Sequence, residues 1–154
     1  MFQVVKSFVI CGQISGCFWC YFSGNWITED FDRYLHFIYT SLNSVKVQQE
    51  NTALTIVNNS RALTKSQRIA MRDAVYAQES QAAKLCGHAI VMNSWFDRMS
   101  TRALRLIFPP PYEEHMFSSP DRALVWLKTK SNTFNPSLVW QAILVSVPNE
   151  NLFW

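Results

Sequence analysis

Two cysteines three residues apart, Cys17 and Cys20, are the residues whose spacing most resembles a chemical motif, because C-x-x-C pairs are typical of redox and zinc sites. A redox pair normally lies at a helix N-terminus, where the dipole lowers a thiol pKa. Here both lie in a predicted strand, where an offset of three places them on opposite faces. Cys11 is expected to face Cys17 across a hairpin, and Cys86 is far away in sequence. A zinc site needs four ligands, so the cysteines are interpreted as structural and no metal is expected.

The histidines and paired carboxylates do not form a recognisable catalytic pattern. His36 is expected to be solvated, His88 to begin a buried strand and His115 to lie in an edge strand, each without a carboxylate or serine at suitable spacing. Glu113 and Glu114 are interpreted as solvated residues at a loop edge. The glycines fit neither a phosphate-binding loop nor a dinucleotide motif, and G-x-S-x-G is absent. The sequence therefore predicts a protein that is not an enzyme and has no cofactor.

Three arginines offer a candidate binding surface. Arg98, Arg102 and Arg105 fall within about 60° on one face of a predicted helix, away from Trp95 and Leu106. One interpretation is a solvated helix face. The other is recognition of an acidic partner, a phosphate or an anionic lipid head group, because arginine pairs well with phosphate.

Overall charge and hydropathy restrict the class of partner. The net charge of +3 and the pI of about 8.7 are only mildly basic, whereas nucleic-acid binders usually have a clustered basic face and a higher pI. The sequence contains no run of about 18 uninterrupted apolar residues, so it predicts no membrane-spanning helix. The apolar segment near the N-terminus lacks a convincing signal-peptide cleavage site. We therefore expect a cytoplasmic protein with reduced thiols and without a nucleic-acid partner.

The elements that position these residues alternate between strand and helix. Strands are predicted over 2–11, 17–22, 53–57, 88–93 and 113–117, the first two forming a hairpin with a turn at 12–16. Helices are predicted from a cap at Thr28, from a capping box at Thr64 to about Leu85, from Ser94 to about Phe108, and from Ser119. Strands alternating with helices predict an α/β fold with a largely parallel sheet and right-handed crossovers.

The character of the chain changes after Lys130. Residues 131–135 are predicted to be a linker, and 137–147 a helix that is apolar almost all round. Such a helix requires cover, which is supplied either by its own domain or by a partner or second copy. We therefore divide the chain into a domain over 1–130 and a C-terminal apolar extension over 131–154. The candidate partner-binding residues of this extension are Trp140, Leu144, Phe153 and Trp154.

Two passages resemble bacterial STAS-like domains, which share the fold of anti-sigma-factor antagonists. Residues 22–35 (FSGNWITEDFDRYL) are similar to the opening strand and helix of that family. Residues 117–127 (FSSPDRALVWL) are similar to its closing helix, and the element order between them also matches. The resemblance covers roughly residues 2–128 and implies a protein–protein regulatory or scaffolding module, sometimes near membranes and usually not an enzyme.

Phosphorylated members of that family carry an acidic strand end and a serine at the start of the next helix. Here the corresponding strand end reads Val57-Asn58-Asn59-Ser60, without an aspartate, and Ser60, Thr64 and Ser66 are the hydroxyls near the expected place. This departure argues against phosphoregulation, and Thr64 is better explained as a helix cap.

The sequence therefore favours a non-enzymatic, STAS-like interaction module in the bacterial cytoplasm. It would bind a protein partner or a second copy through the C-terminal extension, the arginine face, or both. Proximity to a membrane as a peripheral protein is compatible with this function. The alternative is a small-ligand or lipid-binding domain with an aromatic cavity, because six tryptophans and eleven phenylalanines exceed what a small core usually needs.

Overall fold

The computed structural model describes residues 8–24, 26–45, 49–58, 63–149 and 152. The strands are β1 (Phe8–Ile14), β2 (Cys17–Ser23), β3 (Asn51–Asn58), β4 (Leu85–Met92) and β5 (Glu114–Phe117). The helices are α1 (Thr28–Ser44), α2 (Lys65–Tyr76), α3 (Glu79–Ala82), α4 (Trp95–Ile107), α5 (Pro120–Lys130) and α6 (Pro136–Ser146). This order confirms the predicted alternation of strands and helices.

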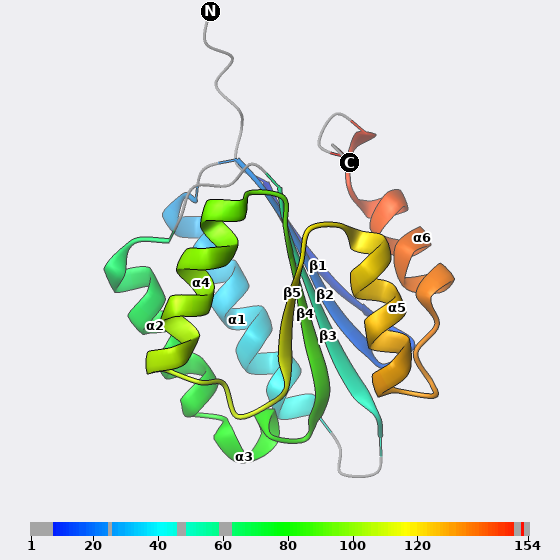
Figure 1. Ribbon diagram of the computed structural model, residues 1–154, viewed down its shortest axis with the longest axis horizontal. Helices are drawn as coiled ribbons and strands as arrows, with labels where there is room; N and C mark the ends of the chain where they lie inside the picture. Colours follow the sequence, from blue (N-terminus) through cyan, green and yellow to red (C-terminus); the bar gives the residue numbers. More distant parts are fainter. Residues whose placement is uncertain (1–7, 25, 46–48, 59–62, 150–151, 153–154) are drawn as a thin grey trace, which may run out of the picture.

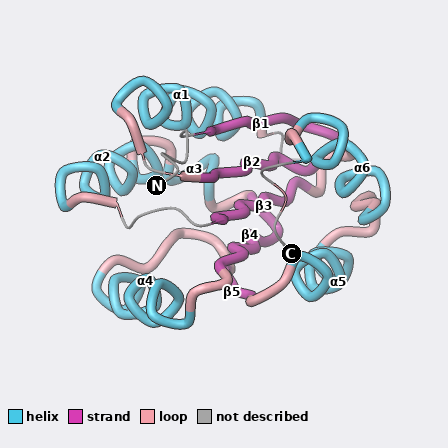
Figure 2. The backbone as a smooth tube through the Cα atoms, turned by 90° about the horizontal axis from the view of Figure 1, so that it is seen from above, coloured by secondary structure: helices cyan, strands magenta, loops and turns pink. Residues whose placement is uncertain are grey.

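The five described strands form one mixed sheet in the order β1-β2-β3-β4-β5 (Figure 1). β1 and β2 are antiparallel, and every later neighbour pair is parallel, which confirms the predicted hairpin and largely parallel sheet. Helices cover both faces, with α1, α2, α3 and α4 on one side and α5 and α6 on the other (Figure 2). All residues of β2 are buried, as expected for a strand covered on both faces.

The hairpin turn is shorter than predicted. β1 continues through Gly12, and the two turn residues, Ser15 and Gly16, both have positive φ. Positive φ at both central residues is typical of the two-residue turns that join antiparallel strands. Because turn position sets the register, Cys11 lies opposite Cys20, and the expectation that it faces Cys17 is wrong.

The helix ends follow local signals at most of the predicted positions. Thr64 and Gln67 form the predicted capping box of α2, and Ser94 accepts a hydrogen bond from the backbone N–H of Asp97 at the start of α4. The prediction for Thr28 is wrong, because the N-cap position of α1 is Ile27 and no side chain caps it. The single helix predicted from 64 to 85 is in fact two, α2 and α3.

The apolar helix α6 packs on the face of the sheet that α5 also covers, and it contributes to the core there. Val139 and Ile143 are fully buried, together with Phe134 in the segment that precedes α6. They belong to one cluster with Leu54 of β3 and Leu127 of α5. One side of α6 is thus covered by its own domain, which was one of the two alternatives left open by the sequence, whereas Leu144 and Val145 on its other side are exposed.

Candidate functional site

Neither α2 nor α4 contains a fully buried residue, and α2 packs on the core through partly buried side chains such as Met71 and Val75. Between these two helices, α1 and the sheet lies a cavity of about 250 Å³. Its walls are mostly aliphatic and aromatic side chains from both layers. They include Phe18, Phe22, Trp26, Phe37, Ile38, Leu42, Val57, Met71, Val75, Ile90, Met92, Leu104 and Phe108.

A polar cluster interrupts this apolar lining. His88 of β4 places Nδ1 3.0 Å from Oε2 of Glu114 and Nε2 2.8 Å from Oγ1 of Thr55. Arg105 of α4 donates to both carboxylate oxygens of Glu114, at 2.6 and 3.2 Å. Thr55, His88 and Arg105 line the cavity, together with Tyr112. The cluster therefore joins three neighbouring strands to α4 and supplies the cavity with hydrogen-bonding groups.

The electrostatics of the cluster keep Glu114 ionised. Burial raises the pKa of this carboxyl, but the hydrogen bond from His88 and the positive charge of Arg105 outweigh burial and hold the pKa below its usual value. Burial and the neighbouring Glu114 charge raise the pKa of Tyr112, so its phenol stays protonated. The two ring nitrogens of His88 thus each have a hydrogen-bonding partner, one in the Glu114 carboxylate and the other in the Thr55 hydroxyl.

Glu114, His88 and Thr55 are connected in the order of a carboxylate–imidazole–hydroxyl relay. The Thr55 hydroxyl, however, is poorly positioned to act as a nucleophile in acyl transfer. Thr55 lies in the middle of β3, paired with Cys20 of β2 and Ile90 of β4. The backbone around it is part of two parallel ladders, whereas an oxyanion hole needs N–H groups aimed at the reacting carbonyl. The arrangement is better suited to anchoring a polar group of a ligand.

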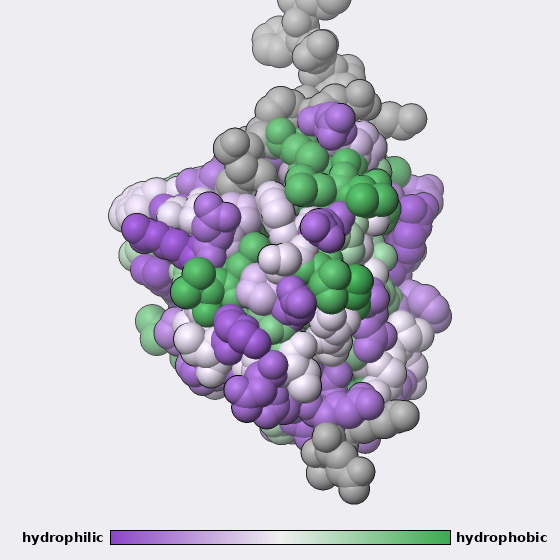
Figure 3. Space-filling model, turned by 90° about the vertical axis from the view of Figure 1, so that its right-hand side faces the viewer, coloured by the Kyte–Doolittle hydropathy of each residue, from purple (hydrophilic) through white to green (hydrophobic). Residues whose placement is uncertain are grey.

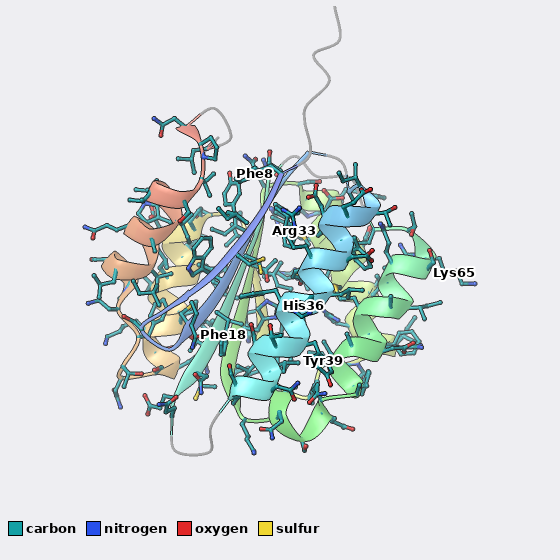
Figure 4. All side chains as sticks on the ribbon, turned by 180° about the vertical axis from the view of Figure 1, so that it is seen from behind. Phe8, Phe18, Arg33, His36, Tyr39 and Lys65 are labelled. Carbon is teal, nitrogen blue, oxygen red and sulfur yellow. The ribbon has the colours of Figure 1, made fainter. Side chains whose placement is uncertain are left out.

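The histidine and carboxylate predictions require correction. Glu114 is buried and ion-paired, so its interpretation as a solvated residue is wrong. His115 also has a carboxylate neighbour, with Nε2 3.5 Å from Glu113, and it stacks on Trp126. His36 lies on the exposed side of α1 with Arg33 and Tyr39, as expected (Figure 4).

The three predicted binding arginines have different surroundings. Arg98 donates to the backbone carbonyls of Met92 and Asn93, and Arg105 is bound to Glu114. Arg102 is exposed and, within the described part of the chain, has no hydrogen bond or ion pair. Two of the three guanidinium groups are thus already bound to the protein itself.

The candidate residues of the extension are also dispersed. Trp140 is half-buried against the core, and Leu144 is exposed. Phe153 and Trp154 lie outside the described residues. Apolar side chains gather on the outer surface over α5 and α6 (Figure 3), among them the highly exposed Val125 and Val145.

The cysteines lie in the sheet, and Cys17 and Cys20 are on opposite faces of β2, as the sequence predicts. Cys17 belongs to the core with α5 and α6, whereas Cys20 lies in the α1 layer. Sγ of Cys20 is 2.6 Å from Sγ of Cys11. The described residues contain no group of three or more His, Cys, Asp or Glu side chains arranged to bind a metal.

Of the hydroxyls considered for phosphorylation, Thr64 caps α2 and lies 3.1 Å from the hydroxyl of Ser66. Ser60 lies outside the described residues. Among the helices that the structure describes, none has the length and hydropathy required to span a bilayer.

Comparison with known proteins establishes the fold. No family model and no curated protein matches the sequence. The structure is similar to that of an uncharacterised protein from Shewanella loihica PV-4, a DUF3478 family member with a SpoIIAA-like fold. The match has 16% sequence identity and a TM-score of 0.56, and covers 82% of this chain and 98% of that one. The chain therefore has the STAS-like α/β fold that the sequence predicts.

Proposed function

We propose that this protein is a non-enzymatic binding domain that takes a small amphipathic molecule into the cavity between the sheet and helices α1, α2 and α4. The observation that carries the proposal is the combination of apolar walls with one cluster of hydrogen-bonding groups. Binding sites for small molecules are typically apolar, with a few placed polar groups that orient the ligand. This is the alternative function that the aromatic composition suggests.

The size of the cavity limits the ligand. An engineered apolar cavity of roughly 150 Å³ takes up benzene, so 250 Å³ suits a somewhat larger molecule, such as a medium acyl chain. Its polar end would lie near Thr55 and His88, where a hydroxyl or carboxylate finds hydrogen-bonding partners. The remainder would contact apolar side chains such as Phe37 and Ile90.

Calorimetric titration with 1-decanol and with decanoate tests this proposal. Saturable one-to-one binding is expected, and Ala53→Leu should weaken it because Ala53 lines the cavity. Ala77→Leu, the same change at an exposed residue after α2, serves as the control. Thr55→Val should weaken binding because it removes the hydroxyl near the polar end of the ligand, while the apolar walls stay the same. Heats without saturation for both compounds would contradict the proposal.

The second candidate is the protein–protein module favoured by the sequence. It is supported by the fold and by the exposed apolar side chains over α5 and α6, including Val125, Leu144 and Val145. A partner or a second copy would cover this surface in the bacterial cytoplasm. Sedimentation velocity tests self-association. A dimer that Val125→Asp dissociates would support self-association. A monomer at all concentrations would exclude a second copy and leave a different protein as the partner.

A further inference from the structure

Helix α4 presents its apolar face to solvent. Trp95, Phe96, Met99, Ala103, Leu106 and Ile107 fall within about 120° of one another on a helical projection. These six residues, here called the outer face of α4, are all exposed. The exposed fraction is 87% for Leu106 and 71% for Phe96. The polar side chains Asp97, Thr101 and Arg105 instead line the cavity.

This orientation is the reverse of the usual one for a helix that covers a sheet, in which the apolar stripe faces the core. Exposed apolar patches of such continuity mark surfaces that are covered in the functional state. The outer face contains no hydrogen-bonding side chain except the indole of Trp95. Specific protein interfaces average about one hydrogen bond per 100–200 Å², which this face could hardly supply.

Basic side chains border the outer face of α4. α2 and α4 each contain three basic residues and one acidic residue, so together they carry six positive and two negative charges. Their sum is +4, and the buried carboxylate of Glu114 neutralises Arg105, which leaves +3, as much as the net charge of the whole chain. The exposed Arg102 lies at the edge of the face, and the Arg72 guanidinium lies 5.0 Å from the ring of Phe108 at the end of α4. Asp73 partly neutralises Arg72.

We propose that the outer face of α4 inserts shallowly into an anionic lipid bilayer surface, with Arg102 and Arg72 at the head groups. A helix with bulky apolar residues on one side and basic residues at its borders is typical of interfacial helices. A second copy is a poorer occupant, because two such layers would bring like charges together. The proposal does not depend on a ligand in the cavity.

Co-sedimentation with lipid vesicles tests the proposal. The intact protein should bind vesicles of equal parts phosphatidylglycerol and phosphatidylcholine, and bind pure phosphatidylcholine weakly. Leu106→Asp should reduce binding by about tenfold or more, since it removes a side chain whose burial drives insertion. Val145→Asp is the matched control, because Val145 is 88% exposed on α6, on the opposite side of the sheet. Arg102→Glu should weaken binding most at low salt.

Two results would overturn the proposal. One is equal binding of the intact protein and Leu106→Asp to the anionic vesicles, or no binding by either. The other is a dimer in sedimentation velocity that Leu106→Asp dissociates, in protein that does not bind vesicles; the outer face would then be an interface between copies. Circular dichroism of each variant establishes that it is folded.

Discussion

Replacement of Glu114 by glutamine should destabilise the fold through loss of one buried charge. The Glu114 side chain is 3% exposed and accepts two hydrogen bonds from Arg105 and one from His88. Glutamine keeps the shape but removes the charge, and it presents an NH₂ group where an acceptor is needed. The variant thus leaves the guanidinium of Arg105 without its counter-ion, on the side of α4 that faces the cavity.

The magnitude follows from the burial of the two partners. Removing one partner of a buried ion pair costs about 3–5 kcal/mol. Arg105 is 28% exposed, so solvent screens part of this loss, and we expect about 2–3 kcal/mol. For a chain of this length, that corresponds to a fall in Tm of roughly 4–12 °C. Urea unfolding monitored by circular dichroism measures it.

The pH dependence provides an independent signature. Because the pKa of Glu114 in the folded protein lies below its ordinary value of 4.5, the carboxylate stabilises the fold above that value. This contribution is lost as pH falls through the folded pKa. The stability difference between the intact protein and Glu114→Gln should therefore be full at neutral pH and shrink below about pH 4.5.

Glu113→Gln is the matched control, because Glu113 is the exposed neighbour whose carboxylate pairs with Lys130 at the surface. It should change stability only slightly. Equal effects of the two substitutions, or a Glu114→Gln difference that does not shrink in acid, would refute the reasoning about the buried cluster.

Three further predictions concern the sheet and its cover. Deletion of residues 131–154 should unfold the protein, because Val139 and Ile143 complete the core; a folded truncated domain by circular dichroism would contradict this. Gly12→Ala should lower the free energy of unfolding by about 1–3 kcal/mol, because a Cβ atom at Gly12 would lie 2.6 Å from the Trp19 ring; denaturant titration measures the change. Burial raises the pKa of Cys17 to about 12, so iodoacetamide at pH 8 should alkylate it only in denaturant, with labelling located by mass spectrometry.

Much of the fold could be predicted because its signals are local. The capping box at Thr64, the cap at Ser94 and the apolar helix over 137–147 each depend on residues a few positions apart. Alternation of strand and helix then restricts the topology to a largely parallel sheet. The C-terminal helix covers its own sheet over β1 and β2, where its buried Val139 and Ile143 join the core cluster that contains Trp19 of β2.

The candidate site could not be predicted in the same way. His88, Arg105 and Glu114 come from three separate elements, and no spacing in the sequence connects them. Helical periodicity identifies the apolar and polar faces of α4 but not which of them points outward. The partner of Cys11 depends on a turn that lies later than the glycine pattern suggests.

Native mass spectrometry of the protein purified gently from its own cells tests the central proposal, occupancy of the cavity, most directly. We expect a species heavier than the bare 17.9 kDa chain by the mass of one small molecule, and loss of that added mass in Ala53→Leu. The bare mass alone, with no saturable binding of decanol or decanoate, would contradict the account.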